Sequence, residues 1–166
     1  MVTAVGRVTS LNRSDGGVPK LPVSSAECTT TGLTGDRQRN LKHHGGPDRA
    51  VCLFTQEIID DLAAQGHPIR PGSTGENITI AGLDWPTLIP GTRLTLANTV
   101  VLEITSYTAP CRNIAASFIA GDFSCLDQAK HSGRSRLYAR VVMPGTVAVG
   151  DLVIHIDRSG NGSLAR

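Results

Sequence analysis

Apolar and polar residues alternate along much of the chain, and this alternation predicts strands. The clearest case is residues 93–97 followed by residues 100–105, where leucine, valine and isoleucine alternate with polar partners. A period of two is typical of a strand with one buried face, and Asn98 and Thr99 can form a turn between the two segments. These residues therefore predict an antiparallel hairpin.

Other segments predict strands by the same alternation or by short apolar runs. They are residues 2–10, 22–28, 50–54, 77–85, 136–143 and 146–156. A helix is predicted over residues 55–64, because Thr55 can cap its start and Gly66 can end it. Two more short helices are predicted, one that follows Cys111 and reaches about residue 118 and one after residue 124.

Roughly eight to ten strands with a few short helices predict a mostly β fold, in the form of a closed or partly closed β-barrel. A length of 166 residues suits one domain with a real core. We expect a single domain over residues 1–157 and a polar, flexible tail over residues 158–166.

Composition narrows the classes of partner. Hydrophobic residues make up 40% and charged residues 18%, as in an ordinary globular protein, and a net charge of +2 does not predict nucleic-acid binding. No apolar run reaches the length of a membrane span, and the first residues do not resemble a signal peptide. We expect a cytoplasmic protein that binds neither nucleic acid nor membrane.

Four cysteines are spread along the chain without a CxxC motif, so we expect free thiols in a reducing compartment. Cys28, Cys52 and Cys125 are interpreted as structural. Cys111 differs, because Pro110 before it should end a strand and a helix is predicted to begin just after it, with Asn113 as its N-cap.

A thiol at a helix start beside Arg112 is favoured as thiolate, the form that binds a soft metal or carries sulfur. The alternative is that Cys111 packs as a small hydrophobic residue. Arg37 opens a polar, basic segment that reaches residue 47 and contains His44 and Gly45.

The glycines of this segment allow the backbone to approach an anion closely, and Arg49 offers two parallel donors to a phosphate. A plain polar turn is the alternative for this segment. Asn77 in the sequence GENIT can hydrogen-bond a heterocyclic ligand, or it can simply open a strand.

Four blocks in order resemble the MOSC family, named for the C-terminal domain of molybdenum cofactor sulfurase, and in particular its small stand-alone bacterial members. The blocks are HGGPDRAVCLF, PGSTGENITIAGLDW with PGTRLTLANTVVLEIT, TAPCRNI, and GRSRLYARVVMPGTVAVGDLV. The resemblance covers about residues 20–156 and implies a barrel-like, mostly β fold.

The resemblance also implies that Cys111 is the working residue, as a ligand to the metal of the molybdenum cofactor (molybdopterin) or as a sulfur carrier. It implies that the loop with His44, Gly45 and Arg49, together with Asn77, lies on the same side of the site and holds the cofactor. Arg37 and Arg112 are added to this cofactor-binding set because of their charge.

Three functions follow as hypotheses. The first is a molybdenum-cofactor-dependent oxidoreductase that reduces a small N-hydroxylated substrate with electrons from a partner reductase. The second is a sulfur carrier that receives a persulfide on Cys111 from a cysteine desulfurase and delivers it to metal–sulfur cluster or cofactor assembly. The third is a ligand-binding barrel without catalysis, in which Cys111 only packs.

Overall fold

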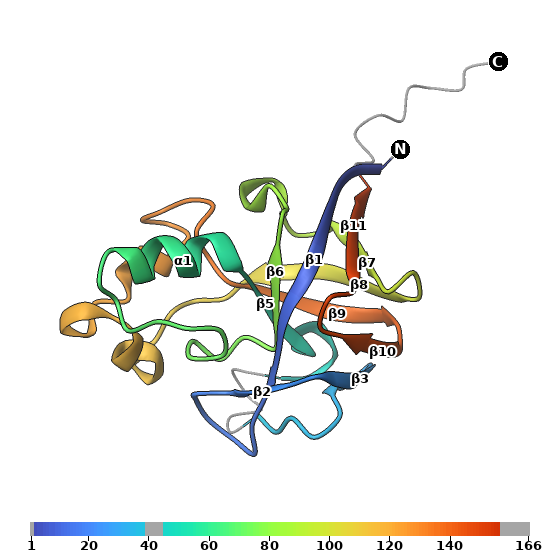
Figure 1. Cartoon of the computed structure of the whole chain (residues 1–166), viewed down its shortest axis with the longest axis horizontal. Helices are drawn as coiled ribbons and strands as arrows, with labels where there is room; N and C mark the ends of the chain where they lie inside the picture. The colour runs from blue at the N-terminus through green and yellow to red at the C-terminus, as the bar shows by residue number, and fades with distance from the viewer. Residues whose placement is uncertain (1, 39–44, 157–166) are drawn as a thin grey trace.

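Seven strands close into a barrel in the structure, a computed structural model that describes residues 2–38 and 45–156 (Figure 1). In order around the barrel they are β1 (Val2–Arg13), β6 (Ile78–Ala81), β5 (Val51–Thr55), β9 (Leu137–Met143), β8 (Val100–Tyr107), β7 (Arg93–Leu96) and β11 (Leu152–Ile156). Pairing of β11 with β1 completes the ring. The predicted mostly β, closed barrel is confirmed.

Four short strands stand outside this ring. β2 (Leu21–Val23) extends the barrel sheet beyond β1, whereas β3 (Ser25–Thr29), β4 (Gly32–Leu33) and β10 (Gly145–Ala148) form a separate three-stranded sheet. The prediction of one strand over residues 146–156 is therefore wrong. The chain bends at Gly150, where φ is 95°, and β10 and β11 go to different sheets. The predicted tail, residues 158–166, lies outside the described residues.

The single α-helix of the described chain, α1 (Gln56–Ala64), makes the one parallel connection of the barrel possible. β5 and β6 pair in parallel, and a parallel pair needs a crossover between the end of one strand and the start of the next. The helix buries Ile59 and Leu62. Thr55 precedes it as predicted, although its hydroxyl donates to Glu57 Oε2 at 2.6 Å rather than capping the backbone.

Alternation along the strands fills the barrel with aliphatic side chains. Fully buried members of this core include Leu53, Ile78, Leu94, Leu102 and Ile104. Because successive side chains of a strand point to opposite faces, the same strands present a second set of residues to the outside of the barrel.

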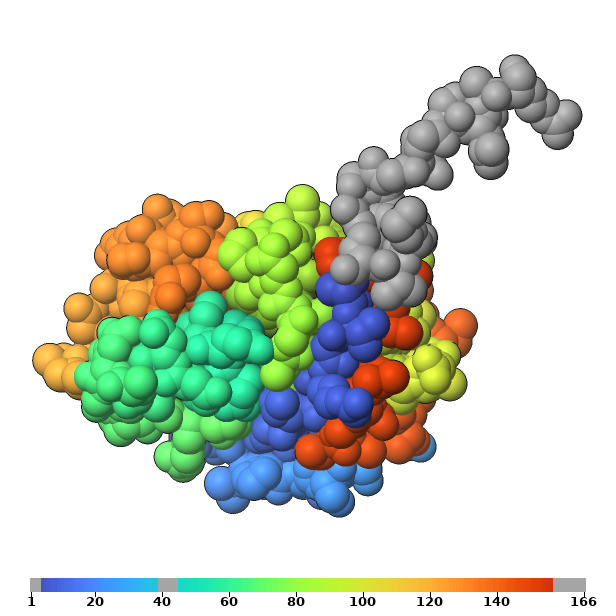
Figure 2. Space-filling model, turned by 45° about the horizontal axis from the view of Figure 1, so that its top comes forward, coloured from blue at the N-terminus to red at the C-terminus, as the bar shows by residue number. Residues whose placement is uncertain are grey.

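Five short 3₁₀ helices lie between the strands in the part of the chain that the structure describes. They are η1 (Pro47–Arg49), η2 (Trp85–Thr87), η3 (Arg112–Ser117), η4 (Ile119–Gly121) and η5 (Ser124–Leu126). The segment that carries η3 to η5 lies against α1 on one side of the barrel (Figures 1 and 2). A salt bridge of 3.0 Å between Arg134 Nη2 and Asp61 Oδ2 ties the two together.

None of the helices in the described ranges is long and apolar enough to cross a membrane. The helix predicted after Cys111 is present, but it is a 3₁₀ helix that begins at Arg112. Its N-cap residue is Cys111, and the predicted cap, Asn113, lies inside the helix.

The β7–β8 hairpin turns one residue earlier than predicted. Ala97 and Asn98 have φ angles of 55° and 61°, and Leu96 O accepts a 3.1 Å hydrogen bond from Thr99 N–H. Two consecutive left-handed residues define a type I′ turn, which strongly favours asparagine and glycine. Alanine in this conformation is strained by contact between its Cβ and the following carbonyl oxygen.

Replacing Ala97 with glycine should therefore stabilise the protein. We expect Ala97→Gly to raise the free energy of unfolding by roughly 1 kcal/mol and the Tm by about 2–4 °C. Ala116→Gly is the matched control, because Ala116 is exposed within η3 and should lose stability on the same change. Thermal unfolding in which both variants move in the same direction would contradict the assignment.

Candidate functional site

A cavity of about 470 Å³ opens beside the barrel, between the outer face of β5 and β9 and several loops. A volume of this size suits a small molecule or cofactor. The residues that line it are Gly17, Val18, Lys20, Arg37, Gln38, Cys52, Thr74, Gly75, Asn77, Ala109, Cys111, Asn113, Ile114, Arg136 and Tyr138.

The floor of this cavity is the outside of the barrel wall. Cys52 of β5 lies directly opposite Tyr138 of β9, and Arg136 precedes Tyr138 by two residues, so all three share one face. The neighbouring pair Leu53 and Leu137 points to the other face and belongs to the core. Loops that cover this outer face turn it into a cavity instead of an exposed surface.

Cys111 borders the cavity and is partly exposed. Its backbone is extended, with φ of −141°, and its carbonyl oxygen accepts a 3.1 Å hydrogen bond from Ile114 N–H. The chain thus leaves β8 after Tyr107, passes Pro110, turns at Cys111 and enters η3. This turn places a thiol at the mouth of a cavity, where a ligand can reach it.

The other cysteines are in different surroundings. Burial raises the pKa of the Cys52 thiol, whose Sγ lies 3.7 Å from Thr108 Oγ1. Burial also raises the pKa of Cys28, to about 11, and that of Cys125. Cys52 is therefore a neutral thiol in the cavity wall, and Cys111 is the cavity thiol with an exposed surface.

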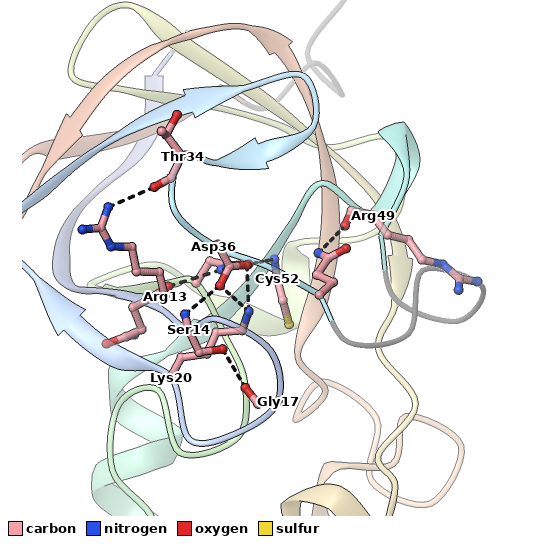
Figure 3. A network of polar contacts seen from close by, with 11 residues as sticks. Arg13, Ser14, Gly17, Lys20, Thr34, Asp36, Arg49 and Cys52 are labelled. Atoms are coloured by element: carbon pink, nitrogen blue, oxygen red, sulfur yellow. Dashed lines mark hydrogen bonds and ion pairs between the residues drawn. The ribbon is translucent and has the colours of Figure 1, made fainter.

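A buried carboxylate joins the loops that form the cavity walls. Both oxygens of Asp36 accept hydrogen bonds of 2.7 Å from Lys20 Nζ, and the two side chains are only 3% and 8% exposed (Figure 3). Asp36 also accepts hydrogen bonds from Ser14 N–H at 2.9 Å and Asn77 Nδ2 at 3.0 Å. The ion pair neutralises Lys20, so this lysine adds no net charge to the cavity.

Asn77 extends the network into the barrel. Its Oδ1 accepts a 3.0 Å hydrogen bond from Cys52 N–H, and its Nδ2 also donates to Asn12 O at 3.2 Å. The side-chain amide is fully used inside the protein. Asn77 lines the cavity, as expected for a ligand-binding residue. Its hydrogen bonds, however, give it a structural role, because they connect β1, β5 and Asp36.

Arg136 is an unexpected member of the site. The residue is 5% exposed, its Nη1 donates to Thr74 O at 2.5 Å, and its Nε–H is buried without a hydrogen-bond partner. No carboxylate in the described ranges forms an ion pair with it. A guanidinium with unused donors therefore borders the cavity.

Glu76 is a fully buried carboxyl group that interacts electrostatically with Arg136, but the two side chains form no ion pair. Its oxygens accept hydrogen bonds from Gly72 N–H and from Thr74 Oγ1, both at 2.5 Å. Burial raises the pKa of this carboxyl group, and the nearby Arg136 opposes the rise only partly. Glu76 organises the loop after residue 70, and its raised pKa reduces the negative charge that it can offer to Arg136.

Two arginines that the sequence predicted for the site, Arg37 and Arg49, differ in their position relative to the cavity. Arg37 borders the cavity with a side chain that is 78% exposed, 3.9 Å from Asp15 Oδ1. Arg49 is not among the residues that line the cavity: its guanidinium stacks on the Tyr138 ring at 5.5 Å and points away from the Asp36 network (Figure 3). Burial raises the pKa of the Tyr138 hydroxyl, which stays protonated.

The other three predicted residues, Gly45, Arg112 and His44, either do not line the cavity or lie outside the described residues. Gly45, with φ of 115°, and the exposed Arg112 are not among the residues that line it. His44 lies outside the described residues. The structure thus brings Cys111, Arg37 and Asn77 to one cavity, with Arg49 in contact with Tyr138 of its wall, and leaves the roles of these residues as predictions.

Sequence reasoning missed Arg136, Tyr138, Lys20 and the cavity position of Cys52. A signal was present for two of them, because alternation in RSRLYARVV places Arg136 and Tyr138 on the face opposite the aliphatic residues. No signal indicated that loops would cover this face and bury an arginine.

Comparisons with known proteins place the chain among small bacterial relatives. The MOSC domain pattern matches residues 40–154. The uncharacterized protein YflK of Bacillus subtilis is 29% identical over 88% of this chain, and the protein YiiM of Escherichia coli is 27% identical over 72%. The matches cover 66% of YflK and 54% of YiiM, so the chain spans about half to two thirds of the length of these relatives.

Solved structures share the fold. The YUAD protein of Bacillus subtilis superposes with a TM-score of 0.72 at 18% identity, covering 95% of this chain and 100% of that one. YiiM of Geobacillus stearothermophilus superposes with a TM-score of 0.71 at 21% identity, covering 94% and 77% respectively.

Exposure and pKa together predict which thiol reacts first. With iodoacetamide at pH 8 we expect alkylation of Cys111 well before Cys28 or Cys52, because a thiol with a pKa of about 11 is ionised in only about one molecule in a thousand at that pH. Peptide mass spectrometry at successive times gives the order. Equal rates at Cys52 and Cys111 would show that the wall around Cys52 is open.

The buried ion pair predicts a large cost for removing one partner. Asp36→Asn should lower the free energy of unfolding by roughly 3–5 kcal/mol, because Lys20 is left buried without a counter-charge. Asp15→Asn is the matched control: it breaks a pair whose side chains are 91% and 78% exposed, and should change stability by less than about 0.5 kcal/mol. Urea unfolding of both variants measures the difference, and similar small losses would refute the role given to Asp36.

Proposed function

We propose that this chain, which belongs to the MOSC domain family, binds a molybdenum cofactor with the Cys111 thiolate as a metal ligand and reduces N-hydroxylated compounds. The observation that carries the proposal is the position of Cys111. A partly exposed thiol stands at the mouth of a 470 Å³ cavity, beside an arginine with unused donors.

The residues present fit such a cofactor. A thiolate is the type of ligand that a soft metal centre accepts, and a pterin bearing a phosphate suits a cavity bordered by Arg37 and Arg136. Within the described ranges, no three His, Cys, Asp or Glu side chains lie close enough together to hold a metal ion. The remaining donors would therefore come from the cofactor rather than from these residues.

The described lining suits a reaction whose chemistry is carried by a bound cofactor. Among the described residues, neither a carboxylate nor a histidine lines the cavity. When bound, the cofactor would supply the oxygen-atom and electron chemistry of the reduction. The chain would hold the metal through Cys111, fix the cavity walls through Asp36 and Asn77, and keep bulk water from the buried side.

Such a reaction needs electrons, so the proposal includes a partner reductase and a small N-hydroxylated substrate. The second candidate is a sulfur carrier, and the exposure of Cys111 favours it equally, because a persulfide must be reachable by both donor and acceptor. A cysteine desulfurase would then be the partner. A carrier has no need of a cavity with a cationic wall, and this places it second.

The decisive experiment is cofactor retention. Purified protein is mixed with cofactor released from a molybdenum enzyme, desalted and analysed for molybdenum and pterin. We expect the wild-type chain to retain the metal and Cys111→Ser to retain at least about tenfold less. Cys52→Ser is the matched control, because its thiol borders the same cavity but is buried, and it should retain the metal like the wild type.

Other outcomes would decide against the proposal. Equal molybdenum in Cys111→Ser and wild type would remove Cys111 as a ligand. If the wild type retains no cofactor but gains a mass of one sulfur atom at Cys111 after incubation with a desulfurase and cysteine, the carrier function replaces the reductase. If the wild type shows neither cofactor retention nor a persulfide, the ligand-binding barrel without catalysis is the hypothesis that remains.

A further inference from the structure

We infer that Arg136 is the anchor of an oxyanion subsite, which binds a phosphate or carboxylate group in the wall of the cavity. The inference deepens the proposed function, because it concerns the same cavity. It needs no metal, however, and can be tested on protein that holds none.

Arg136 has unused hydrogen-bonding capacity. Nearly all buried polar groups in proteins have a partner, and a guanidinium offers five donors. Arg136 spends one on Thr74 O at 2.5 Å, and its Nε is the only buried side-chain nitrogen or oxygen in the described ranges without a partner. The bond to Thr74 fixes the orientation of the group, and an anion can satisfy what remains.

Arg136 also differs from the other cations of the cavity in its charge partners. Lys20 is neutralised by Asp36, and Arg37 lies 3.9 Å from Asp15 Oδ1, whereas Arg136 forms no ion pair with a carboxylate in the described ranges. A buried cation without an ion-pair partner is unfavourable, and a bound oxyanion with charge-assisted hydrogen bonds offsets that cost.

Arg136 also lies close to Cys111 through the backbone. Thr108 N–H donates to Arg136 O at 2.9 Å, and Thr108 precedes Cys111 by three residues. The two functional side chains are therefore attached to adjacent, hydrogen-bonded backbone, and both border one cavity. A ligand whose anionic group binds Arg136 can present another part of itself to Cys111.

Two molecules could bring such a group: the cofactor, through its phosphate, or the substrate, through an acidic substituent. The chemistry recognised is the same in both cases. The structure thus assigns the class of group, and the test below separates its two sources.

The direct test follows the Nε–H of Arg136 by ¹⁵N–¹H correlation spectroscopy during titration with inorganic phosphate. The resonance is assigned by its loss in Arg136→Met. We expect a saturable shift of the Arg136 signal, whereas the signal of the exposed Arg112, assigned with Arg112→Met, should stay in place.

Thermal unfolding gives a second measurement on the same metal-free protein. Phosphate at ten times its Kd should raise the Tm of the wild type and of Arg112→Met by about 3–5 °C. Arg136→Met should keep its stability without phosphate, because an apolar residue of similar length removes an unsatisfied charge, and it should lose the response to phosphate. Arg136→Lys, which keeps the charge, should retain part of the response and serves if the methionine variant does not fold.

Cofactor retention in Arg136→Met then separates the sources of the anion. Pterin retention reduced tenfold or more would assign the subsite to the cofactor's phosphate, and unchanged retention would assign it to the substrate. The inference is overturned if phosphate leaves the Arg136 signal unmoved, or if Arg136→Met still gains stability from phosphate. A phosphate response at Arg136 without any molybdenum retention would sink the reductase proposal alone.

Discussion

The ion pair between Asp36 and Lys20 is the constraint on which the cavity depends. Three segments that are far apart in the sequence meet at this carboxylate: the loop from Ser14 to Lys20, the chain after β4, and Asn77 before β6. Asn77 passes the constraint on to Cys52 in the barrel wall. A buried ion pair is costly unless every donor and acceptor is matched. The Asp36 carboxylate and its three donors, from Lys20, Ser14 and Asn77, therefore have little freedom to rearrange. A rigid wall of this kind can hold a cavity open beside a closed barrel.

The barrel itself could be largely predicted from the sequence. Period-two alternation located the strands of the β7–β8 hairpin and β9, and Thr55 and Gly66 located α1, since these signals are local. The errors are also local in origin. Ala97 is an unusual residue for a left-handed turn, so the prediction fell on Asn98 and Thr99, and the bend at Gly150 was hidden inside an apolar run. How β11 closes on β1 depended on long-range pairing that no single segment specifies.

The site could be predicted only where one residue carried the signal. Cys111 stands out because Pro110 and the following helix punctuate the chain around it, and the structure places it at a cavity. Arg136 does not stand out, since an arginine at the start of a strand usually points to solvent; only the loops folded over the outer face bury it. The same three-dimensional arrangement separates Arg112, which is exposed, from Arg37, which borders the cavity. The positions of arginines in the sequence do not show which of them will be exposed and which will border a cavity.

The central claim is that the sulfur of residue 111 bonds to a metal held in this cavity. The most direct measurement replaces Cys111 with selenocysteine, loads the protein with the cofactor, and records X-ray absorption at the molybdenum edge. The account predicts a selenium neighbour at bonding distance from molybdenum, absent from protein that carries cysteine at this position. Bound molybdenum whose nearest neighbours include no selenium would contradict it.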